Sequence, residues 1–484
     1  MTEAGESHTA DVIVIGGGPA GLAAGQMVTE HGYNATVIES QHAVGGMAKS
    51  FRLWDRVVDV GPHRFFSRDP RVNRWWLKHV GGEYHMVSRK TRILYKGRFF
   101  VYPIELNDAL RNLGLVESVR SAFSFLIAKL RPFKDESTFD KWVTKRFGKR
   151  LFSIFFESYT EKLWGIPTAQ LDSEFAAQRI KKLSLFQAFW SAISGTRRKK
   201  HRTLVDEFAY PNDGAGAPYQ SAATAIEKAG GSIVLGEKVI AIAESSGRWE
   251  IRTDKNRIVQ ASEIVSTMPL TTLVKLLRAP SEVISASERL RFRNTILVYL
   301  KVSTDHLFGD QWLYVQSAEL RTGRITNFNN WGAGDQENYS GTVLCFEYWC
   351  FDDDALWQAG DDELEAIARE DFVQSRINEN ARIEQTFVLR VPKCYPVYDK
   401  GYREDLRILE RFIDNYPGLA AIGRYGAFKY NNQDHSILMG LLAAENICEG
   451  TNHDLWGVNA DDEYQESSLI TETGLAMDHA SEIK

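Results

Sequence analysis

The chain has little of what marks metal-binding, disulfide-rich or nucleic-acid-binding proteins. Only four of its 484 residues are cysteines, and neither close paired spacing nor a neighbouring histidine cluster favours a zinc site or a disulfide framework. Lysine and arginine number 58 against 63 aspartate and glutamate, and this net charge of −5 gives no reason to expect a nucleic-acid partner. We therefore predict no metal, no nucleic acid and a reducing, cytoplasmic environment. The cysteines are Cys345, Cys350, Cys394 and Cys448.

Long apolar runs are also absent. Residues 1–10 are polar and acidic, unlike the basic and apolar regions of a signal peptide. No uninterrupted apolar run reaches the roughly eighteen residues needed to span a bilayer, so no transmembrane segment is predicted. A short apolar run at 121–130, within an amphipathic region, leaves a peripheral membrane contact open.

A glycine-rich turn near the N-terminus is the first chemical signal. An apolar strand over 12–15 runs into the spacing G-x-G-x-x-G, and a helix of small residues follows. Such glycines permit a tight turn, a close approach to a pyrophosphate at the helix N-terminus, and close packing of helix on strand. The pattern predicts a dinucleotide site, although glycine-rich turns are common. The residues expected to contact the dinucleotide are Gly16, Gly18, Pro19, Ala20 and Gly21.

Two further features favour FAD over NAD. A second strand ends at Glu39, followed by Ser40, about twenty residues past the glycines, where a carboxylate can accept the ribose hydroxyls. Next comes a second glycine turn, Gly45, Gly46 and Met47, which in flavoproteins of this type lies against the phosphates of the cofactor. The first fifty residues therefore predict an FAD-binding unit.

Segments far downstream are expected to complete that site. A strand at 232–235 leads to Val239, and a hairpin-like stretch over 249–260 precedes another strand at 263–266. Near the end, a strand closes on Gly423 and Arg424 before an apolar helix, which brings a helix N-terminus and a cation to the pyrophosphate. The cofactor domain is therefore predicted to be discontinuous.

The predicted fold class is α/β, with a Rossmann-type FAD-binding domain interrupted by two substrate domains. Helical spacing marks one of these, which ends in a basic run over 197–202 that is either a solvated loop or a site for an anionic partner or membrane surface. In the other, apolar and polar residues alternate along the predicted strands, which indicates an antiparallel sheet. We assign 1–105, 205–290 and 415–450 to the FAD-binding domain, 106–204 to the helical domain, 291–414 to the sheet domain, and 451–484 to an acidic, mobile tail.

Several strings occur in the order found in one flavoprotein family. They are Gly61-Pro-His-Arg-Phe-Phe66, Tyr159-Thr-Glu-Lys-Leu-Trp164 and Phe428-Lys-Tyr430 before the last helix. Over about 11–448 the chain resembles the UDP-galactopyranose mutase family, within the wider FAD-dependent amine oxidase and protoporphyrinogen oxidase-like superfamily. The second string is the most specific, because it differs from the family pattern only in having leucine where the family has glutamine.

The resemblance implies a flavin-dependent pyranose/furanose mutase acting on a nucleotide-diphosphate sugar in polysaccharide biosynthesis. In that family FAD acts in its reduced form, so a reductant such as NAD(P)H is implied, and the flavin N5 attacks the anomeric carbon as the diphosphate leaves. The protein then has to hold a doubly charged leaving group, which suits arginines and tyrosines. No separate set of nucleophile, base and orienting acid is evident in the sequence.

The resemblance also assigns roles to individual residues. Two arginines would hold the diphosphate, a histidine would lie beside the flavin, an aromatic string would meet the base, and two tyrosines would donate hydroxyls to phosphate. Where the family has an aspartate, this chain has Asn432, with Asp434 as the displaced alternative. The expected catalytic residues are Arg179, Arg324 and His63, and the expected substrate-binding residues are Tyr159, Thr160, Trp164, Tyr395, Tyr430 and Asn432.

A second hypothesis is an FAD-dependent oxidoreductase of the amine oxidase or protoporphyrinogen oxidase type. It shares the glycine unit but transfers hydride from substrate to flavin. The two hypotheses differ in the charge they require, because a diphosphate needs cations whereas an amine or porphyrinogen pocket is expected to be mostly aromatic and apolar.

Overall fold

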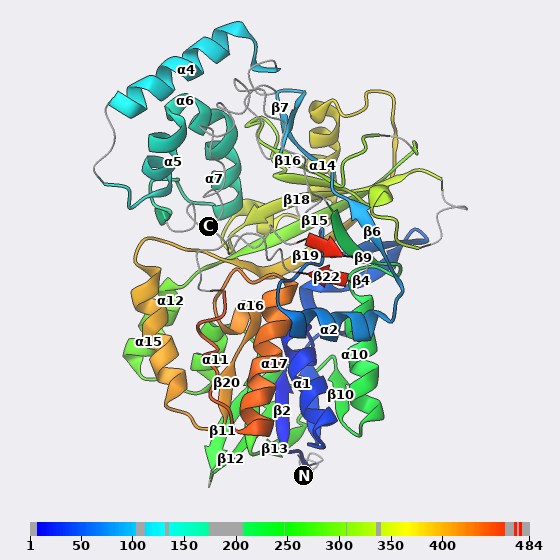
Figure 1. The fold of residues 1–484 in the computed structure, drawn as a ribbon, viewed down its shortest axis with the longest axis vertical. Helices are drawn as coiled ribbons and strands as arrows, with labels where there is room; N and C mark the ends of the chain where they lie inside the picture. The colour runs from blue at the N-terminus through cyan, green and yellow to red at the C-terminus, as the bar shows by residue number, and fades with distance from the viewer. Residues whose placement is uncertain are drawn as a thin grey trace.

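The protein consists of two halves, each built on its own sheet (Figure 1). One half, which contains the N-terminus, has a parallel sheet with helices and a small second sheet packed against it. The other has a larger sheet flanked by a group of helices. The structure is a computed structural model and describes residues 7–102, 112–130, 135–173, 207–245, 247–305, 307–334, 340–459, 469–471 and 474–476.

The parallel sheet has five strands in the order β10-β3-β2-β14-β20. All four pairings are parallel, and β2 and β3 are buried along their whole length, which suits their β-branched, apolar composition. The strands come from widely separated parts of the chain, as the predicted fold class requires. They are β2 (Val12–Ile15), β3 (Ala35–Glu39), β10 (Ser232–Leu235), β14 (Glu263–Ser266) and β20 (Leu419–Ala421).

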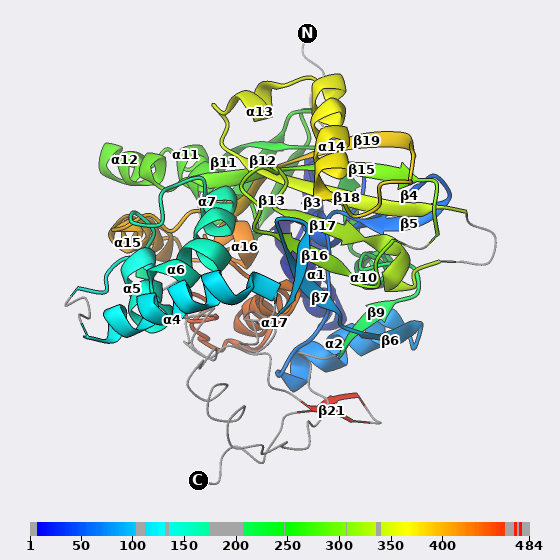
Figure 2. The same ribbon diagram turned by 90° about the horizontal axis from the view of Figure 1, so that it is seen from above.

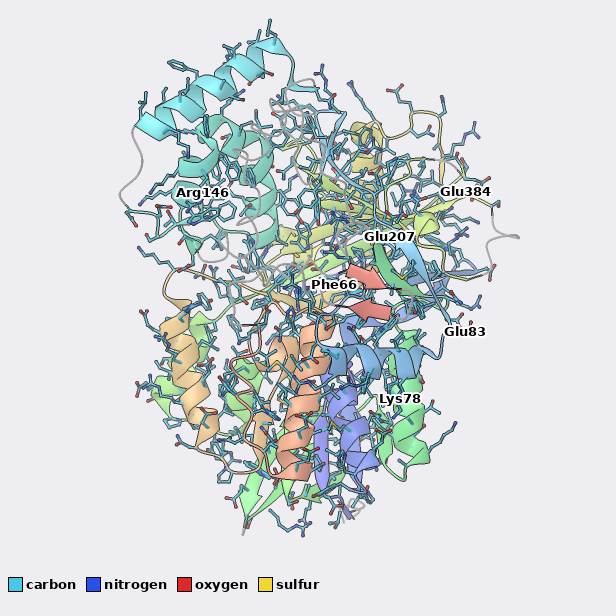
Figure 3. All side chains as sticks on the ribbon, in the orientation of Figure 1. Phe66, Lys78, Glu83, Arg146, Glu207 and Glu384 are labelled. Carbon is cyan, nitrogen blue, oxygen red and sulfur yellow. The ribbon has the colours of Figure 1, made fainter. Side chains whose placement is uncertain are left out.

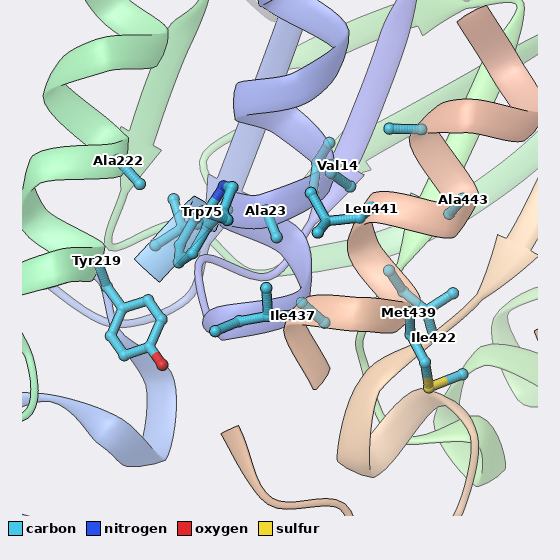
Figure 4. Close-up of a cluster of buried hydrophobic side chains, with 14 of the residues drawn as sticks. Val14, Ala23, Trp75, Tyr219, Ala222, Ile422, Ile437, Met439, Leu441 and Ala443 are labelled. Atoms are coloured by element: carbon cyan, nitrogen blue, oxygen red, sulfur yellow. The ribbon is translucent and has the colours of Figure 1, made fainter. Parts of the chain in front are cut away.

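Alternate residues of these strands face two separate cores. Val12 and Val14 pack against helices, where Ala23, Ile437 and Leu441 lie close together (Figure 4). The neighbouring isoleucines of β2 face the second sheet instead, whose predicted hairpin is confirmed. The helices are α1 (Pro19–Glu30), α2 (Pro70–Val80), α10 (Ala217–Lys228) and α17 (Gln433–Glu449); on the other face lie β1 (Ser7–Thr9), β11 (Val239–Ser245), β12 (Arg248–Thr253), β13 (Ile258–Ala261), α11 (Leu270–Leu276), α12 (Ser281–Arg289) and α15 (Tyr402–Asp414).

The larger sheet has seven strands in the order β19-β15-β18-β17-β16-β7-β8. Its pairings are antiparallel except for β16 with β7. Because that pairing draws in residues 91–101, the structure extends this sheet into the 1–105 segment that the sequence assigns to FAD binding. The strands are β7 (Thr91–Tyr95), β8 (Arg98–Val101), β15 (Phe292–Val302), β16 (Trp312–Val315), β17 (Arg324–Asn327), β18 (Thr342–Cys350) and β19 (Ile383–Pro396), and α14 (Asp361–Ser375) covers one face.

The described part of 106–204 is helical. Residues 174–206, and with them Arg179 and the basic run 197–202, lie outside the described residues. Among the described residues, no helix is both long enough and apolar enough to cross a bilayer. The helices are α4 (Leu115–Leu130), α5 (Phe139–Phe147), α6 (Lys149–Phe152), a π-helical turn (Ser153–Glu157) and α7 (Ser158–Trp164).

The first residues of the predicted tail are packed. Trp456 and Val458 contact the core of the parallel-sheet half, and Lys429 Nζ donates a hydrogen bond to the Val458 carbonyl at 2.7 Å. Packed chain therefore continues past the predicted boundary at 451, because the two apolar side chains Trp456 and Val458 contact this core. Beyond it, the structure describes only β21 (Leu469–Thr471) and its partner β22 (Gly474–Ala476).

A buried carboxylate ends β5 (Arg56–Asp59), which pairs with β4 (Ser50–Leu53). Asp59 is fully buried and accepts hydrogen bonds from Ser50 Oγ at 2.5 Å, Tyr210 OH at 2.8 Å and the Ala215 amide at 3.1 Å. Burial nevertheless outweighs these donors and raises the pKa of Asp59 from 3.8 to about 7.

We expect Asp59 to make stability fall as pH rises. A raised folded-state pKa means that the folded protein binds the proton more tightly, so the stabilisation is complete below the unfolded pKa of 3.8 and is lost as pH rises through 7. Relative to Asp59→Asn, the wild-type protein should lose about 2–4 kcal/mol between pH 4 and pH 8. Urea unfolding of both proteins at several pH values measures this difference. A difference that does not change with pH would show that Asp59 is ionised throughout.

Candidate active site

A cavity of about 1180 Å³ opens at the carboxyl ends of the parallel strands and extends to the seven-stranded sheet. Ligands bind at this edge in open α/β sheets. Its volume exceeds the roughly 300–1,000 Å³ of ordinary small-molecule pockets, which leaves room for a cofactor and a substrate. Phe66, near the junction of the two halves, lines it (Figure 3).

The two predicted glycine turns lie together at one end of this cavity. The Glu39 carboxylate accepts hydrogen bonds from the backbone N–H of Gly17 at 2.7 Å and of Gln41 at 2.8 Å. The backbone N–H of Gly45 donates to the Gly17 carbonyl at 2.8 Å. The carboxylate is thus fixed beside the N-terminus of α1, where backbone N–H groups face an anion. This combination of helix N-terminus, glycine turns and carboxylate fits a dinucleotide.

Most residues predicted to bind the cofactor line the cavity. Gly21 and Gly45 do not: Gly21 lies inside α1 against the Gly16 carbonyl, and Gly45 packs against Lys49. Their contribution is to permit close packing behind the site. Those on the wall are Gly16, Gly18, Pro19, Ala20, Glu39, Ser40, Gly46, Met47, His63, Val239, Gly423 and Arg424.

His63 lines the cavity and is held by its own loop. Its Nδ1 lies 3.1 Å from the Gly61 carbonyl, so we assign the proton to Nδ1, which leaves the Nε2 lone pair free. Burial, with the nearby charges of Arg324 and Arg424, lowers the pKa of His63 from 6.5 to about 4. The imidazole is therefore neutral at physiological pH.

We expect no titration of His63 between pH 5.5 and 9. Because its folded-state pKa lies below the unfolded value, the stability it contributes is present above pH 6.5 and is lost as pH falls towards 4. NMR spectra of ¹⁵N-histidine-labelled protein, with His63→Gln to assign the signal, measure this directly. A titration midpoint near 6.5 would contradict the burial argument.

Arg324 reaches the cavity from the start of β17 and is held by a carboxylate. Its Nε donates to Glu347 Oε1 at 2.6 Å and a terminal nitrogen donates to Oε2 at 2.5 Å, and that nitrogen also lies 3.5 Å from the Tyr395 hydroxyl. The side chain of Glu347 is 1% exposed and that of Arg324 is 16% exposed. Glu347 and the tyrosine hydroxyls raise the pKa of Arg324 above its usual value, despite the opposing effect of burial. The pair keeps a permanent guanidinium facing the cavity.

Arg424 is enclosed by aromatic rings and carbonyls. It donates to the carbonyls of Cys394 and Asn431, each at 2.8 Å, and its guanidinium lies 4.8 Å from the Tyr395 ring centre and 4.4 Å from that of Tyr430. The two rings stack at 5.4 Å. Arg424 therefore fixes both predicted phosphate-binding tyrosines on the wall of the cavity.

The α7 residues predicted to contact the substrate, Tyr159, Thr160 and Trp164, are not among the described residues that line the cavity, and their contact with substrate stays a prediction. Trp164 is fully buried and contacts the rings of Tyr395 and Tyr430, while Thr160 is buried and Tyr159 packs edge-on against Tyr314 at 5.3 Å. Trp164 is thus enclosed by aromatic side chains, whereas Tyr159 is half-buried. They support the wall that the tyrosines form.

The displaced acid does not reach the cavity. Asn432 lines it as the residue before α17, and its backbone N–H donates to His435 Nδ1 at 3.2 Å. Asp434 is 3% exposed in the first turn of the helix, where burial raises its pKa. Of the two alternatives, a neutral amide takes the cavity position.

The sequence does not predict several wall residues. Glu347 could have been noticed, since it is the one charged residue in the apolar strand β18, a pattern typical of a buried ion pair. Nothing in the local sequence distinguishes other aromatic wall residues, among them Tyr102, Trp312 and Tyr314.

The cavity wall is cationic although the whole chain is acidic. Among the described residues, eleven lysines and arginines line it against five aspartates and glutamates. In a concave site of low dielectric, such an excess concentrates anionic ligands. The cations are Lys49, Arg64, Arg89, Lys238, Arg324, Arg390, Lys393, Arg403, Arg407, Arg424 and Lys429, and the acids are Glu39, Glu237, Asp254, Glu347 and Glu410.

Comparison with known proteins places this cavity in a flavoprotein fold. Residues 19–448 match the profile of a family described as "Flavin containing amine oxidoreductase". A protein named "Probable UDP-galactopyranose mutase" from Klebsiella pneumoniae is 25% identical over 167 residues, 33% of this chain and 42% of that relative, so the match spans less than half of its length.

Two solved structures share the fold. A reduced UDP-galactopyranose mutase superposes with a TM-score of 0.81 at 20% identity and covers 93% of this chain and 96% of its own. A putrescine oxidase with bound putrescine has a TM-score of 0.60 at 14% identity, covering 92% and 100%. At these identities the likeness shows the fold alone, which confirms the predicted fold class.

Proposed function

We propose that this chain, which belongs to the family of flavin-containing amine oxidoreductases and has FAD as its cofactor, acts on a nucleotide-diphosphate sugar. The proposed reaction interconverts the pyranose and furanose forms of that sugar. The wall excess of eleven cations over five acids carries this proposal. A diphosphate is attracted by such a wall, whereas a protonated amine substrate is repelled.

When bound and reduced, FAD would supply a nucleophilic N5 for chemistry at the anomeric carbon. Arg324 binds the departing phosphate, and Glu347 fixes the plane of its guanidinium. The hydroxyl of Tyr395 remains protonated because burial keeps its pKa well above its usual value. This hydroxyl and that of Tyr430 donate to phosphate oxygens. Neutral His63 presents a lone pair rather than a charge to the flavin side.

The remaining parts of the chain take roles consistent with this site. We propose that 1–105, 205–290 and 415–450 hold FAD, and that 106–204 and 291–414 form the substrate side, with β7 and β8 assigned to the latter. Arg179, by resemblance, supplies the second diphosphate-binding arginine. A reductant such as NAD(P)H keeps the flavin reduced.

The test uses the FAD-loaded protein reduced with dithionite without oxygen. A panel of nucleotide sugars is incubated with it and the products are separated by chromatography, with the oxidised protein as control. The proposal expects an isomeric product from the reduced protein only. Absence of isomerisation across the panel, together with bleaching of the flavin by an amine, would overturn it.

A second candidate is an oxidoreductase of the amine oxidase type. It is favoured by Glu347, which offsets the charge of Arg324, and by the aromatic wall around it that includes Trp312 and Tyr314. This candidate expects substrate-dependent bleaching of FAD and oxygen consumption, neither of which a non-redox mutase produces.

A further inference from the structure

Helix α4 presents a continuous apolar face to solvent. Figures 1 and 2 show it as the outermost of the helices beside the seven-stranded sheet. Seven of its large apolar side chains are between 46% and 82% exposed. They are Leu115, Val116, Val119, Phe123, Leu126, Ile127 and Leu130.

The exposed residues form one stripe. At 100° per residue, all seven fall within a sector of about 120°. Its buried residues, Ser121 and Ala128, lie on the opposite side and are small. A surface helix normally turns its apolar face to the core, so α4 is inverted: it packs through small side chains and leaves the apolar stripe without a partner among the described residues.

Cations border this stripe. On the same helical projection, Arg120 and Lys129 lie just outside its two edges, where long side chains can extend a charge away from an apolar surface. A second cavity of about 370 Å³ adjoins the helix and is lined by Arg120, Ser124, Lys149, Arg150 and Ser153.

Positive charge is in excess at this small cavity. Glu117 is shared by Arg120 at 2.9 Å and Arg150 at 2.7 Å, and Lys149 has no ion-pair partner within the described part of the chain. One carboxylate thus faces three cations. Ser124 Oγ accepts the Arg150 amide at 3.0 Å, which fixes the helix pair around the cavity.

We propose that α4 binds the surface of an anionic phospholipid bilayer, with its apolar stripe at the acyl boundary and Arg120, Lys149 and Arg150 on headgroup phosphates. An amphipathic helix bordered by cations is the chemistry that such an interface recognises. A second copy of the chain fits less well, because stable protein interfaces use roughly 20–30 residues a side and like-charged borders would meet.

The test is co-sedimentation of the FAD-loaded protein with vesicles of phosphatidylcholine alone and of phosphatidylcholine with phosphatidylserine. We expect binding to the mixed vesicles and weak binding to neutral ones. The double variant Phe123→Ser, Leu126→Ser should bind at least about tenfold more weakly, with unchanged flavin content. Val373→Ser on α14, where an equally exposed valine lies alone, should bind like the wild type.

Each other outcome overturns the proposal. Failure to bind mixed vesicles excludes a lipid surface, and equal binding by the wild type and the α4 double variant excludes the stripe as its cause. A dimer that dissociates to monomers in the double variant, seen by light scattering, assigns the stripe to a second copy instead.

Added salt should release the protein from mixed vesicles, since the headgroup contacts are ionic.

Discussion

Replacing Arg324 with alanine should abolish most of the activity while FAD remains bound. Among the described residues, its side-chain hydrogen bonds go to Glu347 and Tyr395 and not to the glycine turns, so cofactor content should not change, but the diphosphate loses a charged donor. Loss of one such donor in a preorganised site costs about 10²–10³ in kcat. Binding of UDP to the oxidised protein, measured by calorimetry, should weaken about ten- to a hundredfold.

Alanine at position 324 also leaves Glu347 buried without its partner. Breaking a buried ion pair in this way costs about 3–5 kcal/mol of stability, which complicates any activity measurement. The double variant Arg324→Ala, Glu347→Gln removes the unpaired charge, so it should regain much of the stability and none of the activity. Recovery of activity in the double variant would mean that Arg324 serves only to neutralise Glu347.

Arg390→Ala is the matched control for charge. Arg390 also lines the cavity, but the side chain of its ion-pair partner Asp361 is 59% exposed, so the pair contributes little. Removing this arginine lowers the wall charge by the same amount as removing Arg324. If Arg324→Ala and Arg390→Ala lose equal amounts of UDP affinity, UDP binding depends on the overall positive charge of the cavity wall and not on a contact made by Arg324.

Local sequence predicts the cofactor end of the site better than the substrate end. The glycine turns, Glu39 and the following strands depend on residues within about fifty positions, and their geometry is set by backbone requirements of the βαβ unit. The Glu39 carboxylate accepts a hydrogen bond from the Gly17 backbone N–H, as expected of a carboxylate at the end of a strand at that spacing.

The substrate end depends on pairings that no local pattern specifies. Trp164 is buried because Tyr395 and Tyr430, more than 200 residues later, come together around it. The same string could have lined an open cavity had β19 ended differently. Arg324 was identified by resemblance, but its partner Glu347 follows only from the register of β17 against β18.

The largest structural effect is expected from Gly16→Ala, which should yield a protein without FAD. Gly16 has φ of +105°, and a Cβ there would lie 2.0 Å from Thr267 Oγ1. That hydroxyl donates to the Ile15 carbonyl at 2.9 Å, so it cannot move without disturbing the end of β2. Backbone strain and overpacking each cost about 1–3 kcal/mol, enough to displace the turn that faces the cofactor.

Two comparisons separate the clash from the strain. Gly32→Ala imposes a similar φ of +86° with no atom within 4 Å, so it should cost some stability and leave flavin content unchanged. Gly16→Ala with Thr267→Ala removes the colliding hydroxyl, and flavin absorbance per protein should rise above that of Gly16→Ala alone. If the double variant stays colourless, the positive φ of Gly16 rather than its contact with Thr267 is what the cofactor site requires. Backbone strain at position 16 is then the one cause of FAD loss that both variants share.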